Sequence, residues 1–365
     1  MADALKDTLY TREGIEAFAT AFKDAHDEFD SDDFLARVYD VHWPDLALKQ
    51  RMRQITLALH ENLPDDFRLA LRIIHKTIPS IGHYGWMTLS FHDYVELYGL
   101  DDLDAAIPAL EEFTPLCSSE FAVRPFIINY PERMMQQMLN WTQHPSPEVR
   151  RLASEGCRPR LPWGVSLPAL KKDPSPILPV LDALKLDESE FVRRSVANNL
   201  NDIAKDNPQV VIRVLRQWNA DHDGPEIDWI TRHALRTLLK AGEPDALAIL
   251  GYAAPKVVVS GLVIEPERVT MGGKMQFSFT VQSTSDAPQN LMIDYVVYLM
   301  RANGKQSQKV FKLTKRSLQP GERVTLTRKQ DFKPISTRKY YPGDHAIEIQ
   351  INGQRFERQD FVLVE

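Results

Sequence analysis

Asp202 is the carboxylate whose surroundings are most unusual for its type. It follows Asn199-Leu-Asn, with Asn198 four residues before it and Asp206 four after it. This spacing places polar side chains beside the apolar stripe of a helix rather than opposite it. Asn and Asp are poor helix formers, and such locally costly choices often mark a site. The alternative is structural: Asp202 binds N–H groups of a neighbouring helix, or pairs with Arg151 or Arg194 of an adjacent repeat.

Glu120 is the second candidate carboxylate. It follows Ser118 and Ser119, a pattern that predicts the start of a helix. A carboxylate at a helix start is favoured by the exposed N–H groups there, so a capping role is the alternative to catalysis. A fixed carboxylate can act as a general base or stabilise a developing positive charge.

Two aromatic residues lie near these candidates in the sequence. Trp163 follows Arg158-Pro-Arg-Leu-Pro, a predicted loop, where its electron-rich face could stack on a cation or on a sugar. The alternative is a tryptophan that fills a gap between repeats. Phe121, directly after Glu120, is a weaker candidate because phenylalanine at such a position is more often part of the core.

Several familiar sites are absent from the sequence. It contains no Gly-rich phosphate loop, no Gly-x-Ser-x-Gly elbow and no His-Glu-x-x-His helix. The ten histidines do not cluster at ligand spacing, and Cys117 and Cys157 form no Cys-x-x-Cys pair. We therefore expect no metal and no cofactor, and two reduced, inert cysteines.

From about Thr11 to Leu250 the apolar residues recur at helical spacing, in pieces separated by breakers. Prolines such as Pro79, Pro131, Pro147 and Pro208 are expected between these pieces or at their starts. The sequence from Val149, Val-Arg-Arg-Leu-Ala-Ser-Glu, recurs from Val192 as Val-Arg-Arg-Ser-Val-Ala-Asn and more weakly from Ile230. Separations of 43 and 38 residues are typical of HEAT-type helical pairs, which bury their apolar faces by stacking on neighbours.

After Pro255 the pattern changes to period two. Seven segments rich in Val, Ile, Phe and Tyr alternate with turn signals such as Asn303-Gly and Asn352-Gly. These predict an immunoglobulin-like sandwich without an inter-sheet disulfide. The expected fold class is thus α + β multidomain: an all-α HEAT-like-repeat solenoid over residues 1–254, then a β-sandwich over residues 255–365. The seven predicted strands cover residues 256–264, 275–283, 292–300, 309–315, 323–329, 345–351 and 355–364.

Charge is unevenly distributed along the chain. Residues 1–120 hold 10 Lys and Arg against 23 Asp and Glu, whereas residues 256–365 hold 17 against 11. The overall net charge of −6 therefore says little about partners. No apolar stretch is long enough for a membrane span or a signal peptide, so we expect a cytoplasmic protein with no membrane partner.

Three phrases in the helical region are long and specific. They are Ser119-Glu-Phe-Ala-Val-Arg-Pro-Phe126, the run from His144 to Trp163, and the run from Phe191 to Pro208. Here the sequence closely resembles the DNA alkylation-repair glycosylases built from HEAT-like repeats, specifically the AlkC branch. The resemblance covers residues 11–250, and one subgroup of that branch carries a C-terminal immunoglobulin-like domain.

The resemblance implies a monofunctional DNA glycosylase of base excision repair. Its substrates would be double-stranded DNA with cationic alkylated bases, chiefly 3-methyladenine and 3-methylcytosine. A cationic base leaves as a neutral molecule and needs little protonation. The enzyme must then stabilise the positive charge that develops on the oxocarbenium-like sugar. The resemblance assigns that work to Glu120 and Asp202, and lesion or sugar contact to Trp163 and Phe121. It also favours a monomer that associates with the nucleoid when bound to DNA.

Clustered bases are the expected DNA contacts. In the helical region they lie at corresponding turns of the repeats, where their charges could line one wall along the phosphates. In the sandwich, residues 301–339 hold 12 bases against two acids, which could instead be a charged edge that deters sheet aggregation. The expected contacts are Arg150, Arg151, Arg158, Arg160, Lys171, Lys172, Arg193, Arg194, Lys312, Lys315 and Arg316.

The competing function is a non-catalytic HEAT-repeat scaffold that binds DNA or protein, a common use of such solenoids. Such a scaffold has no need of Glu120, Trp163 and Asp202 at their positions.

Overall fold

The computed structural model describes residues 2–334 and 339–365. The chain forms two compact units, one of residues 1–207 with 223–230 and the other of residues 208–222 with 231–365. The last helix ends at Ile249 and the first strand begins at Val257. The change from helix to strand therefore falls where the sequence pattern changes. The domain division at residues 254 and 255 lies in this connection and stays a prediction.

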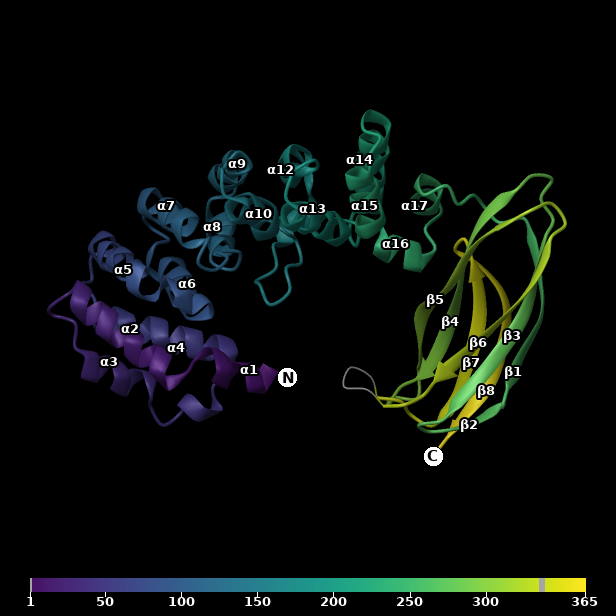
Figure 1. Ribbon diagram of the computed structural model, residues 1–365, viewed down its shortest axis with the longest axis horizontal. Helices are drawn as coiled ribbons and strands as arrows, with labels where there is room; N and C mark the ends of the chain where they lie inside the picture. The colour runs from purple at the N-terminus through teal and green to yellow at the C-terminus, as the bar shows by residue number, and fades with distance from the viewer. Residues whose placement is uncertain (1, 335–338) are drawn as a thin grey trace. The chain divides into compact units, whose positions relative to one another are not determined.

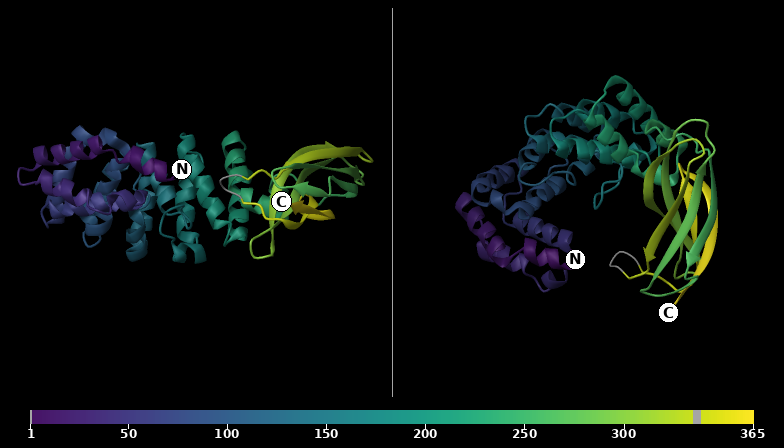
Figure 2. Two further views of the ribbon diagram at one scale, coloured as in Figure 1. Left: turned by 90° about the horizontal axis from the view of Figure 1, so that it is seen from below. Right: turned by 45° about the vertical axis from the view of Figure 1, so that its right-hand side comes forward.

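The first unit is built from helices that follow one another in space in chain order, as the progression of colour from purple to teal shows (Figures 1 and 2). Short 3₁₀ helices lie at Trp43–Asp45 (η1), Gly82–Thr88 (η2) and Ser175–Ile177 (η3). The α-helices are α1 (Ala2–Leu9), α2 (Arg12–Ala25), α3 (Ser31–Val38), α4 (Leu48–Glu61), α5 (Phe67–Ile81), α6 (Leu89–Tyr98), α7 (Leu103–Phe113), α8 (Val123–Asn129), α9 (Pro131–Trp141), α10 (Pro147–Gly156), α11 (Pro168–Lys172), α12 (Leu178–Leu184) and α13 (Glu190–Ile203).

The two strongest copies of the sequence repeat form α10 and α13, which pack against each other. Pro147 is the first residue of α10, and the Ser146 side chain accepts a hydrogen bond from the Val149 N–H. The contact between the two helices is partly polar, because Asn199 Nδ2 donates to the Ser154 carbonyl at 2.7 Å. Stacked repeats thus bring the polar side of α13 onto α10, and this junction carries the candidate site.

Three of the four prolines named above follow the prediction. Pro131, Pro147 and Pro208 each begin a helix, but Pro79 lies inside α5, two residues before its end. Pro79 has no N–H to donate to the carbonyl four residues earlier, and α5 ends soon after it, at the buried Ile81.

The second unit contains the remaining helices and all the strands, except that α15 begins in the first unit. Its helices are α14 (Pro208–Asp221), α15 (Pro225–Ala234), α16 (Arg236–Ala241) and α17 (Pro244–Ile249). Its strands are β1 (Val257–Glu265), β2 (Arg268–Thr270), β3 (Lys274–Ser283), β4 (Gln289–Met300), β5 (Gln306–Leu318), β6 (Arg323–Asp331), β7 (Gly343–Ile351) and β8 (Gln354–Val364).

The strands form two sheets packed face to face, with orders β1-β3-β6 and β2-β8-β7-β4-β5 (Figure 1). Side chains from both sheets meet in one core, among them Phe277, Phe279, Tyr295 and Ile349. The predicted fold class is confirmed. The prediction missed β2, whose three residues pair in parallel with β8, because so short a strand shows no alternation. Arg338, in the basic stretch, lies outside the described residues.

The turn predicted at Asn352-Gly353 joins β7 to β8. Both residues have positive φ angles, 44° and 81°, as a two-residue hairpin turn requires. Gly353 also meets Gly242 at the end of α16, and a Cβ on Gly353 would lie 2.4 Å from the Gly242 carbonyl oxygen. The backbone at the end of α16 thus packs directly on the backbone of the β7–β8 turn.

Candidate active site

A cleft in the first unit brings together residues from distant parts of the chain. Its volume is about 410 Å³. Four of its residues are among those predicted from the sequence: Glu120, Phe121, Arg158 and Trp163. The complete lining is Trp86, Leu89, Cys117, Ser118, Glu120, Phe121, Glu155, Arg158, Leu161, Pro162 and Trp163.

Glu120 reaches the cleft from a turn. A helix start at Ser118 and Ser119 was expected, and this prediction is wrong, because α8 begins three residues after Glu120, at Val123. The Ser118 hydroxyl accepts a hydrogen bond from the Glu120 N–H at 3.3 Å, which stabilises the turn instead. The Glu120 side chain is 15% exposed. It is therefore accessible from the cleft without being surrounded by bulk water.

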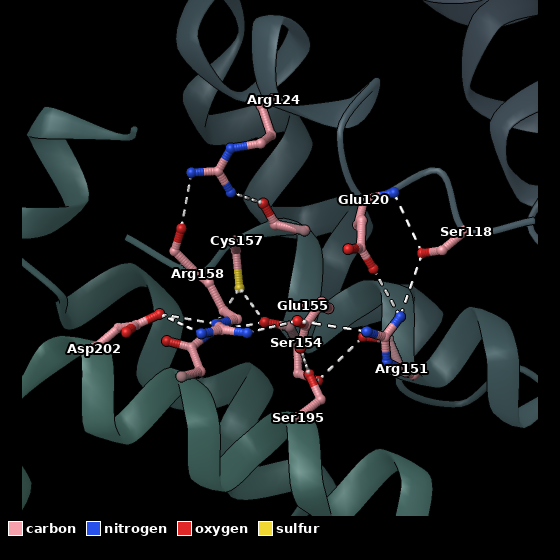
Figure 3. A network of polar contacts seen from close by, with 12 residues as sticks. Ser118, Glu120, Arg124, Arg151, Ser154, Glu155, Cys157, Arg158, Ser195 and Asp202 are labelled. Carbon is pink, nitrogen blue, oxygen red and sulfur yellow. Dashed lines mark hydrogen bonds and ion pairs between the residues drawn. The ribbon is translucent and has the colours of Figure 1, made fainter. Parts of the chain in front are cut away.

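Glu120 is the first member of a chain of alternating charges (Figure 3). Arg151 Nη1 donates to Glu120 Oε2 at 2.8 Å, and Arg151 Nη2 lies 3.4 Å from Glu155 Oε1. Glu155 is buried, and its other oxygen accepts a hydrogen bond from the Ser195 hydroxyl of α13 at 2.6 Å. Buried carboxylates need such partners to remain charged.

The chain of charges continues from α10 into α13. Arg158 Nη1 donates to Glu155 Oε1 at 2.6 Å, and Arg158 Nε donates to Asp202 Oδ2 at 2.8 Å. The other oxygen of Asp202 lies 2.9 Å from Lys205 Nζ. Three acids and three bases therefore alternate, and the set is electrically balanced. We call it the charge chain: Glu120, Arg151, Glu155, Arg158, Asp202 and Lys205.

Asp202 does not line the cleft. Its side chain is 2% exposed, and Arg158 lies between it and the cleft. The structural alternative raised for Asp202 is therefore realised, with Arg158 and Lys205 as partners in place of Arg151 or Arg194. Asp206, one turn later, pairs with Arg160 in the same way, at 2.6 Å. The first pair links α13, and the second links the turn that follows α13, to the loop after α10.

The loop of residues 158–167, here called the Trp163 loop, is fixed at its base by Arg124. This fully buried guanidinium donates to the carbonyls of Val165, Gly156 and Arg158, the last two at 2.8 and 2.9 Å. Burial lowers the pKa of Arg124 to about 10, and the group still carries its charge at neutral pH.

Trp163 lies near the tip of this loop. Its φ angle of 64° is in the left-handed region, which is uncommon for an aromatic residue and typical of functional positions. The side chain is 64% exposed, so it does not fill a gap between repeats. Trp163 instead lines the cleft together with Phe121, where a flat cationic ligand could stack.

Two thiols lie near the site. Burial raises the pKa of Cys117, which lines the cleft, to about 11, and that of Cys157 to about 12. Both remain protonated thiols at neutral pH, and both are free cysteines. Neither is an activated nucleophile.

The bases predicted to contact DNA fall into two groups. Four are already engaged inside the first unit. Arg151 and Arg158 belong to the charge chain, Arg150 Nε donates to Asp187 at 2.6 Å, and Arg193 donates to the carbonyls of Asp187 and Glu188. These partners give the four bases structural roles inside the unit, and their predicted contact with DNA stays a prediction. The second group, Arg160, Lys171, Lys172 and Arg194, is wholly or partly exposed, and within it Arg160 and Arg194 form surface ion pairs with Asp206 and Glu190.

The sandwich presents its predicted contacts on β5, an edge strand. Lys312, Lys315 and Arg316 are exposed there. Beside them, on β4, Asp294 is buried, and burial raises its pKa to about 6 while Lys312 and Lys315 oppose that shift. The charged edge also suits the alternative, protection against edge-to-edge pairing.

Neither a metal site nor a membrane span is found where the structure can be described. Among the side chains that the structure describes, no group of three or more His, Cys, Asp or Glu is placed to hold a metal ion. Over residues 2–334 and 339–365, no helix is both long and apolar enough to cross a bilayer.

Several residues of the site were not predicted from the sequence. Glu155 lies within a repeat phrase, and its spacing of four from Arg151 and three from Arg158 is the signal that could have identified it. Arg124 is part of the phrase that begins at Ser119. Trp86 is 39% exposed and lines the cleft from η2, but no sequence signal identifies it.

Comparison with known proteins agrees with this architecture. Residues 258–365 match the family described as "Uncharacterised protein YhaZ, C-terminal Ig-like domain". The chain is 45% identical over 363 residues to "Uncharacterized protein YhaZ" of Bacillus subtilis (strain 168), covering 99% of each chain. It superposes with a TM-score of 0.90, at 36% identity and 99% coverage of each chain, on the Pseudomonas fluorescens alkylpurine DNA glycosylase AlkC bound to DNA containing an abasic site analog. The chain belongs to the AlkC branch of the HEAT-like-repeat DNA alkylation-repair glycosylases.

Proposed function

We propose that this protein is a monofunctional DNA glycosylase that removes cationic alkylated bases, 3-methyladenine and 3-methylcytosine, from double-stranded DNA. The observation that carries the proposal is the cleft. It combines a partly exposed carboxylate, Glu120, with the aromatic rings of Phe121 and Trp163. The Pseudomonas fluorescens relative, bound to DNA containing an abasic site analog, supports a nucleic-acid substrate of the same kind.

The chemistry follows from the charge of the lesion. A base methylated at N3 is cationic and departs as a neutral molecule, so leaving-group protonation contributes little. Positive charge then develops at C1′ of the sugar, and a carboxylate fixed nearby stabilises that state more than the ground state. Glu120 is placed for this role and for orienting the attacking water. Arg151, whose Nη1 donates to Glu120 Oε2 at 2.8 Å, holds the carboxylate in place.

The remaining site residues have supporting roles in this proposal. Asp202 acts through Arg158, so it is a positioning residue that keeps the guanidinium in the wall of the cleft. Trp163 and Phe121 contact the lesion or its deoxyribose. A bifunctional enzyme needs an amine nucleophile, and no lysine lines the cleft as far as the described residues extend. Hydrolysis to an abasic site without strand cleavage is therefore the proposed outcome.

The experiment that tests the function is incubation of the protein with methylated duplex DNA and chromatography of the released bases. Free 3-methyladenine and 3-methylcytosine, with strands that break only after alkaline treatment, are expected. If the protein binds the duplex but releases no base, it is a non-catalytic scaffold. Strand breaks without alkali would contradict the monofunctional mechanism.

DNA contact in the helical unit is assigned to the exposed bases. We expect Lys172→Ala to weaken duplex binding uniformly across sequences and to reduce the slope of log K against log salt by about 0.9. Arg150→Ala is the contrasting variant, because its buried ion pair with Asp187 is structural. It should lower the thermal midpoint and leave the salt slope unchanged. Duplex binding is measured at several salt concentrations. A reduced salt slope in Arg150→Ala together with an unchanged slope in Lys172→Ala would overturn the assignment.

A further inference from the structure

Lys49 does not line the cleft, but it contacts two residues that do, Phe121 and Trp163. It lies in the first turn of α4, and its Nζ donates to the carbonyl of Trp163 at 2.9 Å, 114 residues away in the sequence. The same ammonium lies 4.1 Å from the centroid of the Phe121 ring. The Lys49 side chain therefore holds the backbone of Trp163 and covers one face of the Phe121 ring.

The position of Lys49 relative to Glu120 follows from a second, smaller cavity. That cavity is lined by Lys49 together with Tyr10, Leu48, Met52, Trp86, Leu89, Phe121 and Trp163. Phe121 and Trp163 line both cavities, whereas Lys49 lines only the smaller one and Glu120 only the cleft. Lys49 and Glu120 thus line different cavities that share the two rings, and the Glu120 charge acts on Lys49 only as the smallest of the influences on its pKa, which it raises. Lys49 contacts the rings directly and is therefore placed to act on them.

Lys49 and Arg124 hold different parts of the Trp163 loop. Arg124 donates to carbonyls at the base of the loop and at Val165, and Lys49 holds the carbonyl of Trp163 itself. The Trp163 backbone is in the left-handed region, where a residue with a Cβ persists only if its surroundings hold it. Lys49 supplies that restraint from α4.

The surroundings of Lys49 act on its charge in opposite directions. Partial burial lowers the pKa of Lys49, the carboxylates of Glu96 and Asp93 oppose that shift, and the nearby Arg53 adds to it. Asp93 is itself paired with Arg53, whose Nη2 donates to Asp93 Oδ1 at 2.8 Å. The position of the ammonium is therefore fixed by its hydrogen bond to Trp163 and its contact with Phe121.

We propose that Lys49 is a positioning residue that sets the separation and orientation of the Phe121 and Trp163 rings for the lesion. The inference rests on the proposed function, because it assigns the two rings to lesion contact. Loss of Lys49 should free Trp163 while leaving Glu120, the charge chain and the exposed phosphate-binding bases in place.

The test compares Lys49→Met, which keeps the packing on Phe121 but loses the donor, with Lys49→Arg, which keeps both a donor and a cation. Single-turnover excision by Lys49→Met should be about tenfold slower, as for a displaced positioning group. The Kd for undamaged duplex and its salt dependence should not change. Lys49→Arg should recover most of the rate. Lys76→Met, which removes an exposed lysine of α5, is the control for general charge loss.

The loop itself gives a second measurement. Acrylamide quenching of tryptophan fluorescence should increase in Lys49→Met, and this increase should vanish in a Trp163→Phe background. A normal excision rate in Lys49→Met would overturn the proposal. So would a rate loss with a reduced salt slope, which would identify a phosphate contact, or no rescue by Lys49→Arg. Failure of the wild type to release any base would instead reject the proposed glycosylase function.

Discussion

Replacing Glu120 with glutamine should slow base release about 10²- to 10³-fold, the usual cost of removing a fixed group that stabilises transition-state charge. Glutamine has nearly the same shape and can still accept from Arg151, so the turn at Ser118 and the cleft should persist. Only the negative charge beside the sugar is lost. Single-turnover kinetics on DNA with one methylated base measure this effect directly.

The control for Glu120→Gln is Glu132→Gln, an exposed glutamate of α9. It should excise at the wild-type rate. Duplex binding by Glu120→Gln should be equal to or tighter than that of the wild type, because a carboxylate is removed from a DNA-facing cleft. Wild-type excision by this variant would show that the carboxylate has no catalytic role, and the role assigned to Glu120 would be withdrawn.

Replacing Asp202 with asparagine should reduce both stability and activity. The side chain is 2% exposed and neutralises Arg158 and Lys205. Its loss leaves the charge chain with one uncompensated positive charge, which should cost about 3 kcal/mol of unfolding free energy. Excision should fall about tenfold to a hundredfold, because Arg158 loses the partner that fixes it in the cleft wall. Thermal denaturation and single-turnover rates report the two effects separately.

A double-mutant cycle separates a direct role for Asp202 from a relayed one. If Asp202 works only through Arg158, the combined Arg158→Met and Asp202→Asn variant should be no slower than Arg158→Met alone. If the rate losses instead multiply, Asp202 must contact the lesion itself, and Arg158 must move aside when DNA binds. That outcome would restore the direct catalytic role expected from the sequence.

The architecture could be predicted because each signal is local. Apolar residues at helical spacing identify the helical region, and alternating apolar residues identify the sandwich. The phrase that begins at Val149 recurs from Val192, which predicts that α10 and α13 are equivalent and adjacent. Pro79 departed from the prediction because α5 continues through the proline. β2 departed from it because a three-residue strand has no period.

The sequence indicated which residues belong to the site, but it did not indicate which of them form hydrogen bonds or ion pairs with one another. The polar stripe around Asp202 correctly marked a polar face of α13, yet its partner depended on the path of the loop after α10. Arg150 and Arg151 are neighbours in sequence, but only Arg151 joins the charge chain, because consecutive helical residues point in different directions. Lys49 contacts Trp163 across 114 residues, and no sequence spacing carries that information.

The central claim, that the Glu120 carboxylate stabilises a positively charged sugar, is tested most directly by an abasic analogue. Duplexes containing a cationic azasugar and a neutral tetrahydrofuran at the lesion position should be compared by their Kd values for the wild type and Glu120→Gln. The wild type should prefer the cationic analogue by about tenfold or more, and the preference should collapse in Glu120→Gln. An equal preference for the cationic sugar in both proteins would contradict the account.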